Sequence, residues 1–194
     1  MQYQVKNRTA ARVGTTVLTA ALIFLFLIFI TVPLISLFTR ISPADMLTAL
    51  TSPSALQALA LSAGTALVST VIVILFGTPL AYINARVRYP GRNIVDTLTD
   101  LPIVLPPTVA GLALLTAFGA NGMLGQYFSL FGIKIAFTTV AVVIAQIFVA
   151  SPFYIRQARA SFEAVDAEYE YASRTLGAGV VTTFFRVTLP LAAG

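Results

Sequence analysis

The chain of 194 residues contains no cysteine and no histidine. Disulfides, thiolate chemistry and the usual zinc ligands are therefore excluded. We expect neither a catalytic residue nor a metal site on this chain. The absence of cysteine does not indicate a redox compartment.

Charge is also scarce, since only 10% of the residues are charged, against roughly 25% in an ordinary soluble domain. A soluble fold cannot cover its surface with so few charges, and 58% of the residues are hydrophobic. Apolar runs of about 20 residues span a bilayer as helices, and these runs lack the alternation of a barrel strand. The sequence predicts an all-α polytopic membrane protein with four transmembrane helices, at about 13–38, 55–85, 101–119 and 135–156.

No Asp, Glu, Lys or Arg occurs within the apolar runs themselves, Val13–Phe38, Ala55–Ala85, Leu101–Phe118 and Ile135–Ile155. Carriers driven by proton or sodium gradients usually place ionisable groups near the membrane midplane. The chain also lacks the P-loop pattern G-x-x-x-x-G-K-[ST], because its two lysines, Lys6 and Lys134, stand in other settings. An ATP-independent secondary carrier or channel is the weaker alternative. A pump built from this chain needs ATP hydrolysis on another subunit, so we expect no enzyme activity here.

The basic residues predict the orientation in the membrane. The first apolar run follows Lys6, Arg8 and Arg12 and is longer than the roughly 7–15 residues of a signal-peptide core, which indicates a retained helix with a cytoplasmic start. The net charge of +5 is then explained by basic residues on the cytoplasmic side of a cell membrane, and it does not indicate a nucleic-acid partner. With the N-terminus inside, the inner basic residues are Arg86, Arg88, Arg92, Arg156, Arg159, Arg174 and Arg186, and the outer ones are Arg40 and Lys134.

Proline and glycine mark the expected interruptions. Residues 39–54 are interpreted as an outer linker with two Ser-Pro breaks, from which Ser52 or Ser54 caps the second span. Gly77 and Pro79 are expected to interrupt that span near its inner end.

The third span opens with "DLPIVLPPTVAG", in which Pro102, Pro106 and Pro107 each lack an amide proton. A kink or break is therefore expected where this span enters the membrane. Two interpretations stay open. In the first, the prolines and Thr108 line or gate a translocation path, because broken backbone at membrane depth lies in protein or faces water. In the second, they form a packing kink.

A neutral polar path is a related possibility. Hydroxyl and amide side chains occur within the spans, but Ser and Thr often bond the backbone of their own helix instead. The residues concerned are Ser62, Thr65, Ser69, Thr70, Thr108, Gln146 and Ser151.

The segment "AEYEYASRTLGAG" after the fourth span predicts a short cytoplasmic helix, Ala167 to Leu176. Asp166 is a suitable N-cap, Glu168 and Glu170 lie in the first turns, and Gly177 suits a left-handed C-terminal position. The helix is too polar to span the membrane. Either it docks against another protein through small and aromatic residues, or it rests on the membrane surface. The docking residues are Tyr169, Tyr171, Ala172, Ser173 and Ala178.

At these residues the chain resembles the permease subunits of bacterial ABC importers. The segment is similar to the EAA-x3-G-x9-I-x-LP signature. It reads Tyr171-Ala172-Ser173, then three residues, Gly177, nine residues and Val187-Thr188-Leu189-Pro190. Tyr171 stands where the signature has Glu, Glu170 precedes it, and Ser173 replaces the second Ala. The resemblance implies a coupling helix at about 167–177, with contacts to an ATPase subunit from Glu168, Glu170, Tyr171, Ala172, Ser173, Gly177, Leu189 and Pro190.

The resemblance also implies partners. These are an ABC ATPase that holds ATP and magnesium, an extracytoplasmic substrate-binding protein and a second permease copy, whereas no cofactor is expected on this chain. The implied fold is that of type I importer permeases, as a single transmembrane permease domain over 1–194. We expect a fifth span to begin at 188–194 and further helices to follow it, so that the domain is incomplete here.

From about Leu56 onward, the chain is similar to the molybdate and tungstate branch of these permeases, with the sulfate and thiosulfate branch next. The run "LPPTVAG" followed by "FGANG" carries this preference. A path without fixed acids avoids repelling a tetrahedral oxyanion. The resemblance therefore implies an ATP-driven oxyanion importer.

Overall fold

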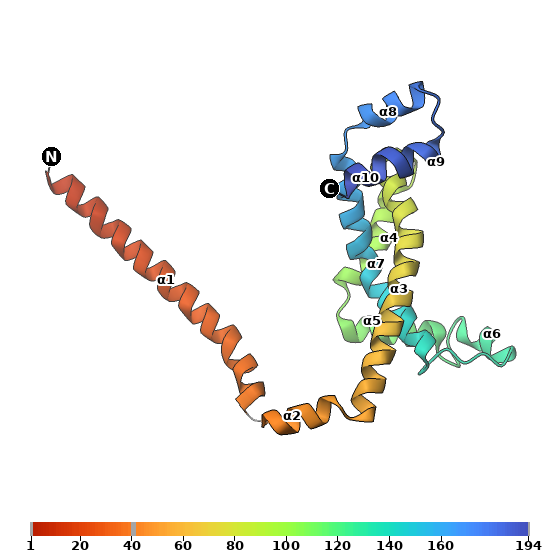
Figure 1. The fold of residues 1–194 in the computed structure, drawn as a ribbon, viewed down its shortest axis with the longest axis horizontal. Helices are drawn as coiled ribbons and strands as arrows, with labels where there is room; N and C mark the ends of the chain where they lie inside the picture. Colours follow the sequence, from red (N-terminus) through yellow and green to blue (C-terminus); the bar gives the residue numbers. More distant parts are fainter. Residues whose placement is uncertain (1, 40–41, 194) are drawn as a thin grey trace. The chain divides into compact units, whose positions relative to one another are not determined.

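The computed structural model describes residues 2–39 and 42–193, and the side chains of 15–39 and 42–193. Arg40, the side chains of Lys6, Arg8 and Arg12, and Gly194 in the expected start of the fifth span lie outside this description. The described residues contain helices and no strand, which confirms the all-α fold (Figure 1). The elements are α1 Gln2–Thr39, α2 Pro43–Leu50, α3 Pro53–Arg86, α4 Arg92–Val104, α5 Pro107–Phe118, α6 Gly125–Leu130, α7 Thr139–Ala164, α8 Ala167–Thr175, α9 Val180–Thr183, the π-helix η1 Phe184–Thr188 and α10 Leu189–Ala192.

Three of the described helices are long and apolar enough to cross a membrane, over Thr15–Thr39, Pro53–Arg86 and Thr139–Ala164. The pair α4 and α5 passes the same test together but is bent by 115°, so that the described part of the chain has three spans, or four if the bent pair counts as one. The chain divides into two compact units, residues 1–58 and 59–194, with the boundary inside α3.

The first unit consists of α1, α2 and the start of α3. Every described side chain from Thr15 to Thr39 is exposed, as suits a helix that is apolar on all sides and meets lipid. The linker expected at 39–54 contains a short helix, α2, at its centre. Ser42 caps α2 by accepting a hydrogen bond from the Asp45 backbone N–H at 3.1 Å, and Pro43 follows as the first helical residue.

Ser52 has the capping role expected for it. Its hydroxyl accepts a hydrogen bond from the Ala55 backbone N–H at 3.3 Å, at the start of α3. The expected interruption at Gly77 and Pro79 is wrong, since α3 runs without a break from Pro53 to Arg86.

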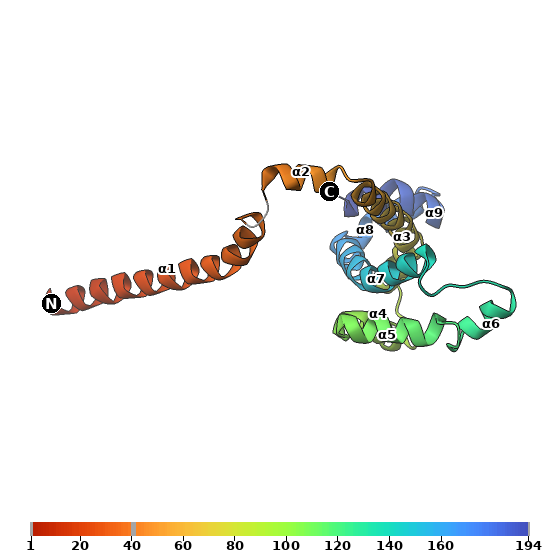
Figure 2. The same cartoon turned by 90° about the horizontal axis from the view of Figure 1, so that it is seen from below.

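Gly77 serves packing instead of breaking the helix. A Cβ built on Gly77 would lie 2.9 Å from Cδ1 of Tyr154 and 3.2 Å from Cγ1 of Ile155, so the glycine gives room to these α7 side chains. Beside it, the hydroxyls of Thr78 and Tyr154 are hydrogen-bonded at 2.6 Å. The views of Figures 1 and 2 agree that α3 and α7 lie side by side.

Some polar side chains of the spans bond the backbone of their own helix, and some also bond a side chain of a neighbouring helix. The Thr65 hydroxyl bonds its own helix at the Leu61 carbonyl (2.9 Å), and the Gln146 amide of α7 donates to Thr65 Oγ1 at 3.2 Å. Ser69 Oγ lies 3.0 Å from both the Ala66 carbonyl and Gln146 Oε1. These groups join α3 to α7, whereas Ser62, Thr70 and Thr108 are exposed.

The buried core of the second unit lies near the C-terminal end of α3. Ala81, Ile155 and Phe162 form it, and Tyr82 and Phe184 pack against it. The ring of Tyr82 meets Phe162 and Phe184 edge-on, at centroid distances of 5.7 and 5.0 Å. This aromatic cluster joins α3, α7 and η1, and it supports the helices that follow α7.

Candidate functional site: the α8 helix and the broken α4–α5 pair

The helix predicted after the fourth span is present as α8, Ala167–Thr175. Asp166 caps it, because its carboxylate accepts a hydrogen bond from the Glu168 backbone N–H at 3.0 Å. Arg174 lies in the last turn. Gly177 adopts the left-handed conformation at φ 88°, the Gly177 N–H donates to the Arg174 carbonyl (3.0 Å), and the Ala178 N–H donates to the Ser173 carbonyl (3.2 Å). Both ends of α8 are therefore closed by local hydrogen bonds, the C-terminus by a Schellman motif.

The inner face of α8 holds a buried acid. Glu170 is only 4% exposed, although it lies in the middle of a short polar helix. Its Oε1 accepts hydrogen bonds from Nε of Arg86 and Oγ1 of Thr188, both at 2.9 Å, and its Oε2 accepts one from the Tyr82 hydroxyl at 3.0 Å. The carboxylate thus joins α8 to the end of α3 and to η1.

Arg86 contacts a second point of the same segment. Its Nη2 donates to the Val165 carbonyl at 2.8 Å, immediately before the N-cap of α8. Ser173 adds a weaker link, because its hydroxyl lies 3.1 Å from that of Thr183, which is fully buried in α9. The inner face of α8 is therefore fixed at its start, middle and end.

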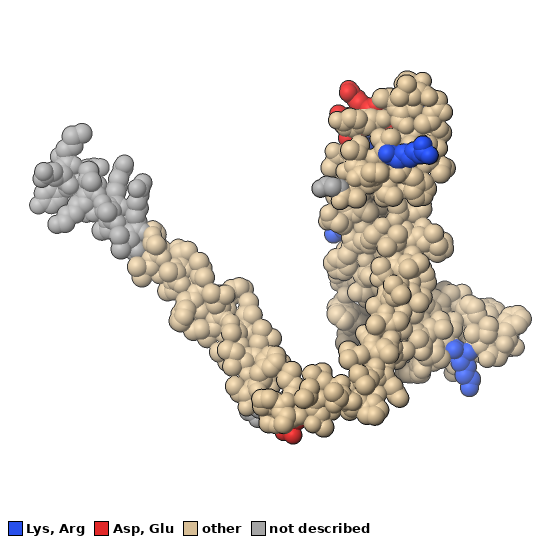
Figure 3. Space-filling model, in the orientation of Figure 1, with Lys and Arg blue, Asp and Glu red and all other residues tan. Residues whose placement is uncertain are grey.

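The outer face of α8 is open. Tyr171 is 63% exposed and Leu176, the C-cap, is 89% exposed. In the view of Figure 3, acidic and basic side chains are visible at the end where α8, α9 and α10 lie, and a further basic side chain is visible near α6. The exposed residues of this segment are Glu168, Tyr169, Tyr171, Ala172, Arg174, Thr175, Leu176 and Gly177.

The sequence-predicted docking residues therefore separate into two groups. Glu168, Tyr171 and Ala172 lie outward, whereas Glu170 is buried and Ser173 is half-buried. Leu189 and Pro190 begin α10 directly after η1. Leu189 packs against the core, and Pro190 is exposed. Their part in contacts with another subunit stays a prediction.

The break in the third span lies between α4 and α5. Leu105 is the C-cap of α4, Pro106 has an extended conformation with φ −55° and ψ 142°, and Pro107 is the first residue of α5. Pro106, Pro107 and Thr108 are exposed. Pro102 lies inside α4, three residues before the break, so the break itself follows the Pro106-Pro107 pair.

Paired charges hold α4 against α7 and the end of α3. Asp96 Oδ2 accepts from Arg159 Nη1 at 3.0 Å, and Asp96 Oδ1 accepts from the Asn84 amide at 2.9 Å. Asn84 is 1% exposed. Arg156 makes a bidentate pair with Asp100 at 2.7 Å for both bonds. The helices α4 and α7 therefore extend beyond the apolar runs into a charged layer.

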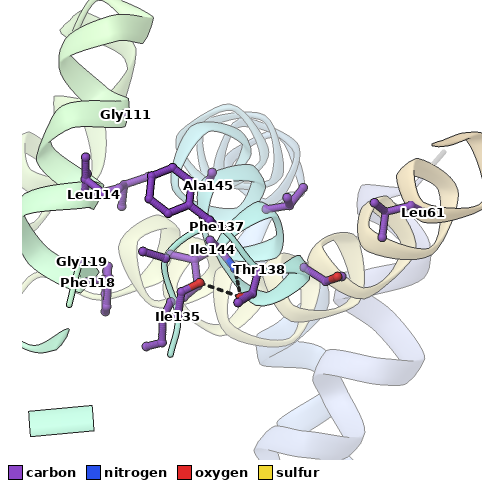
Figure 4. Close-up of a pocket in the computed structure, with 15 residues that line it drawn as sticks. Leu61, Gly111, Leu114, Phe118, Gly119, Ile135, Phe137, Thr138, Ile144 and Ala145 are labelled. Carbon is purple, nitrogen blue, oxygen red and sulfur yellow. Dashed lines mark hydrogen bonds between the residues drawn. The ribbon is translucent and has the colours of Figure 1, made fainter. Parts of the chain in front are cut away.

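An apolar cleft of about 660 Å³ opens at the opposite end of the second unit (Figure 4). Leu114 and Phe118 of α5, Leu61 of α3 and Ile144 of α7 contribute to its walls. Phe137 lines it from the loop before α7, in a left-handed conformation at φ 62°. The lining contains no charged residue, so the cleft suits apolar groups.

The described residues contain no group of three or more Asp or Glu side chains placed to hold a metal ion.

Residues 74–194 match the family described as binding-protein-dependent transport system inner membrane component. The chain belongs to this family. The matched residues include the C-terminal part of α3, the broken α4–α5 pair, α7 and α8, so the membership covers both candidate regions.

Several members with assigned names are similar to this chain. It is 42% identical to the molybdenum transport system permease protein ModB of Mycobacterium tuberculosis, over 85% of this chain and 62% of the relative. A probable molybdenum ABC transporter permease protein of Haloferax volcanii is 39% identical, over 92% and 64%. The sulfate transport system permease protein CysT of Escherichia coli is 34% identical, over 97% and 69%. The chain spans about three fifths of the length of the first of these relatives.

The sequence prediction missed three residues of the α8 network, namely Arg86, Tyr82 and Thr188. One signal was present. Six of the seven acidic residues, all except Asp45, lie between Asp96 and Glu170, on the side where the orientation argument also places seven arginines. That distribution favours ion pairs at the inner ends of the spans, but it does not say which acid meets which base.

Proposed function

We propose that the chain is the permease subunit of an ATP-driven importer and forms the translocation path for an oxyanion. Membership of the inner membrane component family supports this proposal. The observation that carries it is α8, whose inner face is fixed within the chain and whose outer face, from Glu168 to Leu176, is exposed. A capped helix held in this way suits docking onto another subunit.

The proposed partner on this face is an ABC ATPase. ATP and magnesium bind there, since the chain has no P-loop pattern. A substrate-binding protein delivers the oxyanion from the outside, and a second permease copy completes the path. We further propose that the N-terminus lies in the cytoplasm, which puts Arg86, α8 and the charged layer on the ATPase side.

Molybdate or tungstate is the proposed substrate. The names of the relatives from Mycobacterium and Haloferax support molybdenum transport. The polar side chains that join α3 and α7 are neutral, so no fixed acid there repels an anion and no arginine binds it tightly. Sulfate or thiosulfate is the second candidate, because relatives assigned to sulfate transport are 34% and 36% identical.

The path is proposed to pass the broken α4–α5 pair. Pro106, Pro107 and Thr108 are exposed at a bend of 115°, and backbone of this kind at membrane depth lies in protein or faces water. A second permease copy that meets this surface would enclose a path between the two bends.

Reconstitution tests the proposal. The full-length protein, its ATPase and its binding protein are placed in liposomes, and uptake of labelled molybdate and sulfate is measured with and without ATP. Uptake that requires ATP and both partners is the expected result. Uptake by the permease alone, or driven by an ion gradient, would show a secondary carrier and overturn the proposal.

A variant at the outer face sharpens this test. Ala172→Trp places a bulky side chain on the exposed side of α8 and should lower association with the ATPase while the protein still inserts. Gly64→Ala is the matched control, since a Cβ on Gly64 meets nothing within 4 Å. Normal association of Ala172→Trp would exclude α8 as the docking helix.

A further inference from the structure

Glu170 is the acid nearest the centre of α8, and residues of α3 and η1 hold its carboxylate. Both carboxylate oxygens are occupied, by Arg86 and Thr188 on Oε1 and by Tyr82 on Oε2. Its side chain is 5% exposed and that of Arg86 is 16% exposed. The carboxylate already accepts three hydrogen bonds within the chain and is almost fully buried, so an arginine of another subunit that approaches the exposed side of α8 has little access to it.

The helical repeat leads to the same result. With about 3.6 residues per turn, Glu168, Ala172 and Thr175 lie on the side of α8 opposite to Glu170. Those three residues are exposed. A partner that docks on the exposed side of α8 therefore contacts Glu168, Ala172 and Thr175, and not Glu170.

Arg86 is placed to couple two parts of the chain. It is the last residue of α3, a helix of 34 residues that is long enough to span the membrane. Its guanidinium bonds both Glu170, in the middle of α8, and the Val165 carbonyl before the N-cap. Tyr82, one turn earlier on α3, bonds the other oxygen of Glu170 and packs on Phe162 and Phe184. A displacement of α8 thus acts directly on the end of α3.

We propose that Arg86 and Glu170 form a positioning pair that fixes α8 to the end of α3 and to η1, and that Glu170 makes no ion pair with the ATPase. This inference rests on the proposed function, because it concerns how the docked helix transmits force to a span. The ATPase binds the outer face of α8, and the buried pair carries its movement to α3.

A double-mutant cycle in the reconstituted full-length transporter tests the pair. The variants are Arg86→Met, Glu170→Gln and the two combined. Association with the ATPase and binding-protein-stimulated ATP hydrolysis are measured on equal amounts of inserted protein. Arg86→Met should lower stimulated hydrolysis about tenfold or more, because it leaves a buried carboxylate without its cation. Association should change less than about twofold, since the outer face is intact.

The combined variant decides whether the two residues act as one unit. If they do, it is no worse than Arg86→Met alone, because the interaction is already lost. Effects that multiply would place Glu170 and Arg86 in separate interactions and overturn the inference. Weaker association in Glu170→Gln alone would overturn it as well, since it would indicate a direct contact with the ATPase.

Milder variants keep the test valid if Arg86→Met does not accumulate in the membrane. Arg86→Lys keeps the charge but cannot bond Glu170 and the Val165 carbonyl with the geometry of a guanidinium. Tyr82→Phe and Thr188→Val each remove one hydrogen bond and keep the ion pair. Each of the three should lower stimulated hydrolysis about twofold to fivefold with association unchanged. Wild-type hydrolysis in all three would overturn the inference.

Ala172→Trp separates this inference from the proposed function. If it disrupts association while the variants of Arg86 and Glu170 behave independently, only the positioning pair is wrong. If Ala172→Trp and all the variants of the pair associate and stimulate normally, α8 is not the docking helix and the proposed function fails with it.

Discussion

At the C-terminal end of α3, charged side chains from α3, α4, α7 and α8 pair with one another, whereas near Leu61, toward the other end of α3, glycines and apolar side chains take their place. Arg86, Asp96, Arg159 and Glu170 all have ionic partners at the first end. At the second end, the cleft near Leu61 is lined without charge, and Gly119, Gly122 and Gly125 form a tight loop. Leu61, the glycine loop and the charged residues named above all belong to the same compact unit, residues 59–194.

The two ends are held together by different kinds of contact. An ion pair is directional, and it forces particular partners together because an unpaired buried charge is costly. A glycine contact is steric, and it only requires that no side chain intervene. The charged end is therefore suited to transmit movement between elements, and the glycine end to keep a loop compact.

The largest expected effect is at the glycine end. A Cβ on Gly125 would overlap the carbonyl oxygen of Gly119. Gly125→Ala should open the 119–125 loop and destabilise the protein by about 3 kcal/mol, at the upper end of the cost of overpacking. Thermal unfolding of the full-length protein in detergent measures this change.

Gly64→Ala is the control for Gly125→Ala, since its added methyl meets nothing within 4 Å in the middle of α3. It should be neutral or stabilise the helix by up to about 1 kcal/mol. Equal stability of the two alanine variants would contradict the steric account of this end.

The second prediction concerns the bend that separates the two ends. Replacing Pro106 and Pro107 with Ala restores two backbone donors and allows α4 and α5 to join. We expect transport to fall about tenfold, with insertion changed less, if the broken backbone faces the path. Uptake in liposomes and the amount of inserted protein are compared. Equal losses in both would favour a packing kink, and Pro102→Ala, inside α4, is the control.

The sequence predicted the elements better than their partners. The apolar runs, the break at Pro106-Pro107 and the capped helix from Ala167 all depend on local chemistry, which is readable from neighbouring residues. Gly177 was placed in a left-handed turn for the same reason, and its φ is 88°. Even α2 had a readable signal, because Ser42-Pro43 with Asp45 three residues after the serine is a typical helix start.

The pairing of Arg86 with Glu170 was beyond such reasoning. The two residues are 84 positions apart, and only the tertiary fold brings them together. Gly77 and Pro79 were misinterpreted for a related reason, since the space that Gly77 leaves is filled by Tyr154 of another helix. The roles of α8 and of the bend in transport stay predictions.

The third prediction concerns the charged end. Asp96→Ala removes the acceptor for Arg159 and for the amide of Asn84, which is almost fully buried. The loss should be about 1–2 kcal/mol, most of it from the unsatisfied amide, because the carboxylate is partly exposed and solvent screens its ion pairs. Asp96→Asn, which can still accept from Asn84, should recover more than half of the stability. Equal melting temperatures of Asp96→Ala and Asp96→Asn would show that the hydrogen bond from Asn84 contributes little to stability.

The smallest effect is expected at Arg156, although its two bonds to Asp100 are the shortest ion-pair contacts among the described residues, at 2.7 Å. Its side chain is 59% exposed, so water and salt compete for the guanidinium, and short contact distances do not make such a pair strong. Arg156→Ala should leave the melting temperature of the full-length protein nearly unchanged at physiological salt, whereas Asp96→Ala lowers it in the same buffer. A small loss that appears at low salt and disappears at high salt is the expected pattern, because screening acts on exposed charges first. A loss as large as that of Asp96→Ala, and independent of salt, would mean that the pair is shielded in the assembled protein, and that the charged end extends further along α7 than burial within this chain indicates.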